Sequence, residues 1–208
     1  MALVVATLEQ ALVDAFDLME NTDWQVGDNP NEAFAEGVAK AWKDFAESGS
    51  ITTVDVGGIP GGVFAGAGTG SITVDDRPCA DALVAACTQM QNMASGRDTF
   101  LAEKMAAALH SLITSGQVST DVIGTRTPPS SSPVPASGSA KGSMTGIPMP
   151  VQLGLIAAFT TMGGMTAGNS AFLAAQLAPL TRAYLAAAIV TTNGEGSLAG
   201  SIGTGAMT

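Results

Sequence analysis

Charged side chains are scarce in this sequence, and basic ones are the scarcest. Only 12% of the residues are charged, about half the roughly 25% found in a typical globular domain. The net charge is −10, from 18 acidic and 8 basic residues. Because no basic stripe is present to neutralise phosphates, we expect no nucleic-acid partner. The low charge reflects either the composition of a GC-rich genome or a surface largely covered by other subunits.

Histidine and cysteine are nearly absent, with one His and two Cys in 208 residues. This count excludes a disulfide scaffold and the ligand spacing of a zinc site. His110 shares a repeat column with Lys43 and Arg182, so we interpret it as solvent-facing. Cys79 follows a proline near a predicted helix start, where the helix dipole lowers a thiol pKa. Cys87 shares a column with phenylalanines and is expected in the core.

Long hydrophobic runs are absent as well. Residues 142–181 carry no charge, but Pro148, Pro150 and the Gly163-Gly164 pair interrupt them. Neither side of the break supplies the roughly 20 consecutive apolar residues of a transmembrane helix. We therefore expect no membrane partner. A membrane-active, holin-like protein that uses residues 147–190 as a helical hairpin is the alternative.

One eight-residue phrase occurs three times. Residues 12–19 read LVDAFDLM, residues 83–90 read LVAACTQM and residues 155–162 read LIAAFTTM. Each has the apolar spacing of an amphipathic helix. Repetition at a fixed interval of about 70 residues indicates tandem structural units.

A second helical stretch follows each phrase, and the three stretches align without gaps as residues 33–53, 100–120 and 172–192. Their alanine columns allow a neighbouring helix to approach closely. Two larger apolar columns lie seven residues apart, on one predicted helix face. The aligned columns are Ala35/Ala102/Ala174, Ala39/Ala106/Ala178, Val38/Met105/Leu177, Phe45/Leu112/Tyr184 and the closing Thr53/Thr120/Thr192.

The end of each unit follows a common pattern. Ser48-Gly49 and Ser115-Gly116 place glycine where a helix often ends in the left-handed conformation, and a short β-branched strand follows. A glycine-rich tail then closes the unit: GTGSIT at 68–73, AKGSMT at 140–145 and GTGAMT at 203–208. We expect these tails to allow close backbone packing against another chain, or to lie along a strand edge.

The predicted fold is mainly α with short β segments, in three tandem helix–helix–strand–Gly-rich-tail repeats. Unit 1 spans residues 1–78 and is acidic, with 13 acids and 3 bases. Unit 2 spans 79–146 and includes a Pro/Ser-rich extended loop at 127–139. Unit 3 spans 147–208, is almost uncharged and is degenerate: Pro179 is expected to bend or break its second helix.

Known catalytic patterns do not emerge. GAGTG at 66–70 has closely spaced glycines, but no helix follows the equivalent C-terminal tail, and the Lys of a phosphate-binding loop is missing. No GxSxG motif occurs. We therefore predict no enzyme, cofactor, metal site or small-molecule substrate. The rival interpretation, an enzyme or ligand-binding protein with a cleft between units, has His110 and Cys79 as its best residues.

Two pairs of segments resemble structural proteins of tailed-bacteriophage virions. FAESGSITT (45–53) with GAGTGSI (66–72), and LITSGQVST (112–120) with SAKGSMTG (139–146), are similar to the YxxSGxVxT helix ends and GxGxI-like tails of such proteins. The resemblance implies a non-enzymatic component of the tail, baseplate or neck, made in the host cytoplasm and assembled with other virion proteins. A capsid-associated decoration protein is a further alternative.

We expect multiple copies in a symmetric assembly, because three units in one chain resemble a trimer. The predicted assembly contacts are Ser48, Gly49, Gly68, Gly70, Ile72, Ser115, Gly116, Gly142, Met144, Gly203, Gly205 and Met207.

Overall fold

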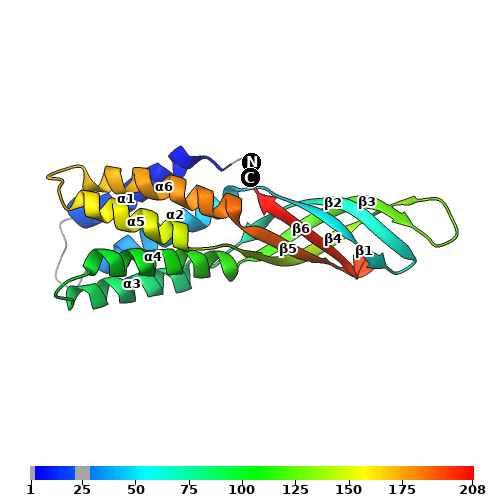
Figure 1. Ribbon diagram of the computed structural model, residues 1–208, viewed down its shortest axis with the longest axis horizontal. Coiled ribbons are helices and arrows are strands. Elements are labelled where there is room, and N and C mark those ends of the chain that lie inside the picture. Colours follow the sequence, from blue (N-terminus) through cyan, green and yellow to red (C-terminus); the bar gives the residue numbers. More distant parts are fainter. Residues whose placement is uncertain (1–2, 22–28) are drawn as a thin grey trace.

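The computed structural model describes residues 3–21 and 29–208. The molecule is elongated, with all helices at one end and all strands at the other (Figure 1). The helices are α1 (Val5–Asn21), α2 (Pro30–Ser48), α3 (Arg77–Gln91), α4 (Arg97–Thr114), α5 (Met149–Met162) and α6 (Asn169–Ala187). The strands are β1 (Ile51–Ile59), β2 (Gly62–Thr73), β3 (Gln117–Thr127), β4 (Val134–Thr145), β5 (Ile189–Gly194) and β6 (Ser201–Met207), with a 3₁₀ turn at Gly196–Leu198.

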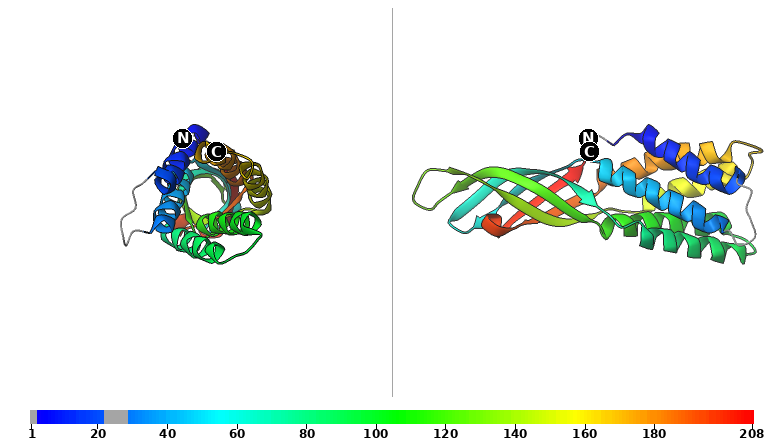
Figure 2. Two further views of the ribbon diagram at one scale, coloured as in Figure 1. Left: turned by 90° about the vertical axis from the view of Figure 1, so that its left-hand side faces the viewer. Right: turned by 180° about the vertical axis from the view of Figure 1, so that it is seen from behind.

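The order helix, helix, strand, strand occurs three times along the chain. The helices form a closed ring: each packs on the next in sequence, and α6 packs on α1. Viewed from the helical end, the ring surrounds the axis along which the strands run (Figure 2). The chain thus has an approximate threefold arrangement.

The predicted fold class is wrong. The six strands form a closed antiparallel barrel in the order β1-β2-β3-β4-β5-β6, and β2 and β4 each have 12 residues. The glycine-rich tails lie in strands β2, β4 and β6, and β4 begins inside the expected Pro/Ser-rich loop at 127–139, at Val134. Glycine occupies inward positions of β2, β4 and β6, and threonine occupies inward positions of β1, β3 and β5. These residues hide the usual alternation of apolar and polar side chains.

Strand register is equivalent in the three units. Within each unit Ile51 pairs with Gly70, Val118 with Gly142 and Val190 with Gly205. Between units, Gly70 pairs with Thr120, Gly142 with Thr192 and Gly205 with Thr53. The tails therefore pair with strands of the same chain on both sides.

The helical ring is built on the repeated apolar columns. Val38, Met105 and Leu177 have no exposed surface, and the alanine columns are buried beside them. Close approach is visible between α1 and α2, where a Cβ added to Gly37 would lie 2.7 Å from Ala15 Cβ. α6 runs through Pro179 as one continuous helix, so the break that was one of the two expected outcomes does not occur. Among the described helices, none has the length and apolar character needed to cross a membrane.

The helix core continues into the base of the barrel. The inward side chains nearest the helices are apolar and belong to the same buried cluster as the ring: Ile51, Ile72, Val118, Met144, Val190 and Met207. A second apolar cluster closes the far end of the barrel and consists of Ile59, Phe64, Val122, Ala140 and Leu198.

Candidate interaction surfaces and buried sites

The predicted contact residues of the glycine-rich tails face the barrel interior. Ile72, Met144 and Met207 are at most 1% exposed and form part of the apolar base of the barrel. Gly68 and Gly203 are also buried. Each lies two residues before Gly70 or Gly205 on the same strand, nearer the tip of the barrel. These side chains point away from solvent and pack within the chain.

Gly70, Gly142 and Gly205 allow neighbouring units to approach closely. A Cβ on Gly70 would overlap the carbonyl oxygen of Ser119 in the next strand. The same overlap occurs between Gly142 and Thr191, and between Gly205 and Thr52. These three glycines therefore stand at the three junctions between units.

The Ser-Gly pairs do end helices, but the predicted left-handed conformation is wrong. Gly49 has φ −72° and ψ 157°, and the third unit has Ala188 at this position with φ −73° and ψ 141°. Gly116 does not have positive φ either. Space explains the glycines: a Cβ would lie 2.9 Å from Met207 Sδ at Gly49 and 2.6 Å from Val74 Cγ1 at Gly116. Ser48 and Ser115 donate their hydroxyls to carbonyl oxygens of their own helices.

His110 and Cys79 do not form a common site. His110 Nδ1 lies 2.9 Å from the Tyr184 hydroxyl and links α4 to α6, so it is half-buried rather than solvent-facing. Burial raises the pKa of Tyr184 to about 12. Burial, and secondarily the charge of Asp76, raises the pKa of the Cys79 thiol to about 12. The expected activation of Cys79 by the helix dipole is therefore wrong.

Cys87 lies where the sequence places it, in the core. It is 4% exposed, and burial raises its thiol pKa. Both cysteines lie on α3 and are free thiols.

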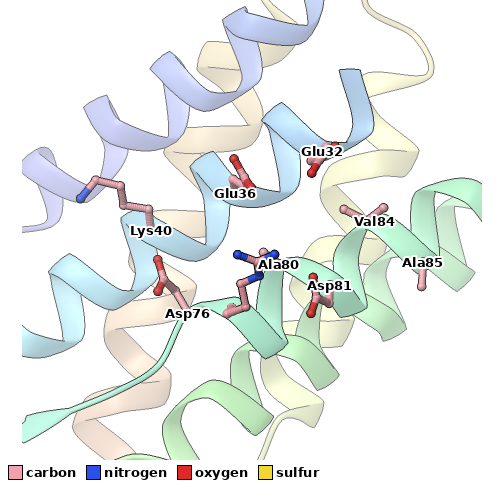
Figure 3. A pocket seen from close by; sticks show the side chains of 9 residues that line it. Glu32, Glu36, Lys40, Asp76, Ala80, Asp81, Val84 and Ala85 are labelled. Carbon is pink, nitrogen blue, oxygen red and sulfur yellow. The ribbon is translucent and has the colours of Figure 1, made fainter. Parts of the chain in front are cut away.

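A groove of about 570 Å³ runs between α2 and α3. Figure 3 shows its charged side chains, which come from both helices and from the residue before α3. Lys40 Nζ binds Asp44 Oδ2 at 2.7 Å. Among the described residues, no group of three or more His, Cys, Asp or Glu side chains is arranged to hold a metal ion. The charged lining consists of Glu32, Glu36, Lys40, Asp76, Arg77 and Asp81.

A smaller apolar pocket of about 190 Å³ is lined by all six helices. Equivalent residues from all three units line its wall, at two positions of the aligned repeats. The pocket therefore lies on the approximate threefold axis of the ring. The hydroxyl of Ser170, which is 7% exposed, finds no hydrogen-bond partner there. The two columns are Phe16/Cys87/Phe159 and Phe34/Leu101/Leu173.

The outer wall of the barrel carries an exposed apolar surface, here called the outer patch. Its side chains are 51–73% exposed. Val56 is opposite Ile202, while Val54 and Ile123 are both opposite Ala67, so the surface is continuous across four strands. The opposite wall, on β4 and β5, is more polar and carries the Lys141–Glu195 ion pair at 3.3 Å. Its exposed large apolar side chains, Val134 and Ile189, lie at opposite ends of that wall. The outer patch comprises Val54, Val56, Val63, Ile123 and Ile202.

Sequence reasoning missed the outer patch and one buried acid. Val54 and Val56 alternate with Thr53 and Asp55, and such an alternation ordinarily places the apolar members inside. In the barrel the order is inverted: Asp55 has no exposed surface, whereas Val54 is 63% exposed. The repeated threonine column was the available signal for this inversion. No protein-family model, curated protein or solved structure matches this chain.

Proposed function

We propose that this chain is a non-enzymatic structural subunit that binds other proteins in the virion of a tailed bacteriophage, in its tail, baseplate or neck. The outer patch carries the proposal of protein binding. Contiguous exposed apolar surface on a folded domain marks an interaction site, and β1 and β2 present no outward charge there. The virion assignment is supported by the resemblance of the helix ends and glycine-rich tails.

The closed barrel bears on how such a subunit binds. Every strand pairs with two neighbours of the same chain, which leaves little open edge for strand addition. The tip-side part of β4, from Val134 to Gly138, pairs with β3 alone. Contacts with a partner then involve side chains on the barrel wall. Because the outer patch lies on one wall and the opposite wall is more polar, the approximate threefold arrangement does not extend to this surface.

The proposal predicts that the protein is present in purified particles and that the outer patch decides its incorporation. In a triple variant, Val54→Ser, Val56→Ser and Ile123→Ser, the fold is expected to persist because the side chains are exposed, and incorporation is expected to fall. The matched control replaces Ser143, Thr191 and Asn193 by Ala on the polar wall. Mass spectrometry of particles measures both variants against the unmodified chain.

Three results would contradict the proposal: absence of the chain from particles, equal incorporation of both variants, or a requirement for the polar wall alone. Cryo-electron microscopy of the particles distinguishes tail, baseplate or neck from a position on the capsid surface. A capsid position would favour a decoration protein instead.

A further inference from the structure

A layer of oxygen-bearing side chains crosses the barrel between its two apolar clusters. Thr53, Thr120 and Thr192 are 3%, 1% and 0% exposed, and Asp55 is fully buried. These threonines are the closing column of the aligned repeats, so each unit contributes one hydroxyl. Asp55 is present only in the first unit, since Val122 and Gly194 occupy its equivalent positions.

The Asp55 carboxylate accepts two hydrogen bonds. Thr53 Oγ1 donates to Oδ2 at 2.6 Å, and Thr192 Oγ1 donates to Oδ1 at 3.4 Å. Thr120 Oγ1 is fully buried and has no partner. A hydroxyl that donates to a carboxylate keeps its oxygen lone pairs free, so these hydroxyls retain the capacity to bind a cation.

Glycines bring these oxygens together. A Cβ built on Gly68 would lie 3.1 Å from Asp55 Oδ2 and 3.2 Å from Thr120 Oγ1, and would overlap Thr53 Oγ1. A Cβ on Gly203 would overlap both Asp55 Oδ1 and Thr192 Oγ1. The four side chains therefore share a confined volume next to the two glycines, in the interior of the barrel.

The layer contains one acidic group and no opposite charge. Within the described residues, no Lys, Arg or His nitrogen forms an ion pair with Asp55. Arg126, which also points inward, is nearer the tip, where its Nη1 lies 3.5 Å from the Pro60 carbonyl oxygen. A buried carboxylate is costly unless a positive partner accompanies it.

We propose that Asp55, Thr53, Thr120 and Thr192 bind one alkali-metal cation, Na⁺ or K⁺, inside the barrel. A single positive charge balances the single carboxylate. Ca²⁺ and Mg²⁺ fit the layer less well, because Ca²⁺ sites draw six to eight oxygens, including several carboxylates, and Mg²⁺ retains several waters. The apolar clusters on both sides seal the layer, so binding is coupled to folding.

Thermal unfolding after refolding in NaCl, KCl or choline chloride, at one ionic strength, tests this proposal. Choline is too large to enter the layer. We expect the melting temperature to be higher in NaCl or KCl. Above the dissociation constant, it should rise by about 3–6 °C for each tenfold increase in the free cation concentration. Equal melting temperatures in all three salts would overturn the proposal.

Three variants assign the effect to the layer. Asp55→Asn and the isosteric Thr120→Val are both expected to reduce the difference between salts at least threefold. Asp121→Asn, which removes a charge from the outer wall of the same barrel, is expected to keep it in full. Should Asp55→Asn fail to fold, Thr120→Val decides the outcome. An unchanged cation dependence in Thr120→Val, or a loss of dependence in Asp121→Asn, would contradict the proposal.

Discussion

The helical ring and the barrel close around the same axis by opposite means. In the ring, large apolar side chains such as Leu177 and Met105 fill the space between helices, and alanines set the helix spacing. In the barrel, a six-stranded wall encloses little space, and glycines and threonines take most inward positions beyond the apolar base. Packing of the ring thus depends on large apolar side chains, whereas packing of the barrel depends on glycines that leave room for neighbouring strands.

This difference explains why one sequence repeat supports two kinds of packing. Helix columns repeat every three to four residues and remain apolar in all three units, as Val38, Met105 and Leu177 show. Inward positions of the strands recur every second residue, and there the three units share either glycine or threonine. The shared glycines are Gly70, Gly142 and Gly205, and the shared threonines are Thr53, Thr120 and Thr192. Side-chain removal and side-chain addition should therefore have different effects in the two regions.

Removal of a large side chain from the ring should have the largest effect. Leu177→Ala is expected to lower the free energy of unfolding by about 3–4 kcal/mol, because it leaves a cavity among fully buried neighbours. Leu153→Ala is the matched control on α5, since Leu153 is 59% exposed, and it should change stability by at most about 0.5 kcal/mol. Denaturant unfolding measures both, and equal losses would contradict the assigned core.

Addition of a single methyl group to the barrel should come next. Gly142→Ala places a Cβ against the backbone carbonyl of Thr191, and overpacking of this kind costs about 2–3 kcal/mol. Gly58→Ala is the control, because nothing lies within 4 Å of a Cβ there. If both alanine variants unfold at the same denaturant concentration, the close approach between units is incorrect.

Alkaline pH should weaken the ring through its buried thiol. The Cys79 pKa is about 12 in the folded chain, against 9.0 as the ordinary value. The unfolded chain therefore loses this proton first, and stability falls as pH rises from about 9 to about 12, by about 1.4 kcal/mol per pH unit. Cys79→Ser should reduce this slope, and the raised pKa values of Cys87 and Tyr184 account for the slope that remains. A slope above pH 9 that is the same in both chains would disprove the assignment.

The smallest of these effects concerns the contact between α4 and α6. Tyr184→Phe removes the hydrogen bond to His110 and keeps the ring packed, so the expected loss is about 1 kcal/mol. His110→Ala should produce a similar loss, and the double variant should lose less than the sum of the two. Strict additivity in this double-mutant cycle would show that the two side chains do not interact.

The sequence predicted the helices far better than the strands. The amphipathic spacing of residues 12–19 and its two copies is a direct helix signal, and Leu12, Leu83 and Leu155 are all buried. The strands were underestimated because glycine is a poor strand former by composition and here serves close approach between units. Nothing in the sequence indicated a site at Asp55, because Thr120 and Thr192 come near it only when the barrel closes.

Closure of β1 on β6 within one chain is the central claim, and a designed disulfide tests it directly. Val56 and Ile202 are opposite each other on these strands and both are exposed, so cysteines at both positions lie within bridging distance. Mild oxidation of Val56→Cys/Ile202→Cys should give a monomer that migrates faster on non-reducing gels. Covalent dimers and longer chains, with little cross-linked monomer, would show that the glycine-rich strands pair between molecules and would contradict the closed barrel.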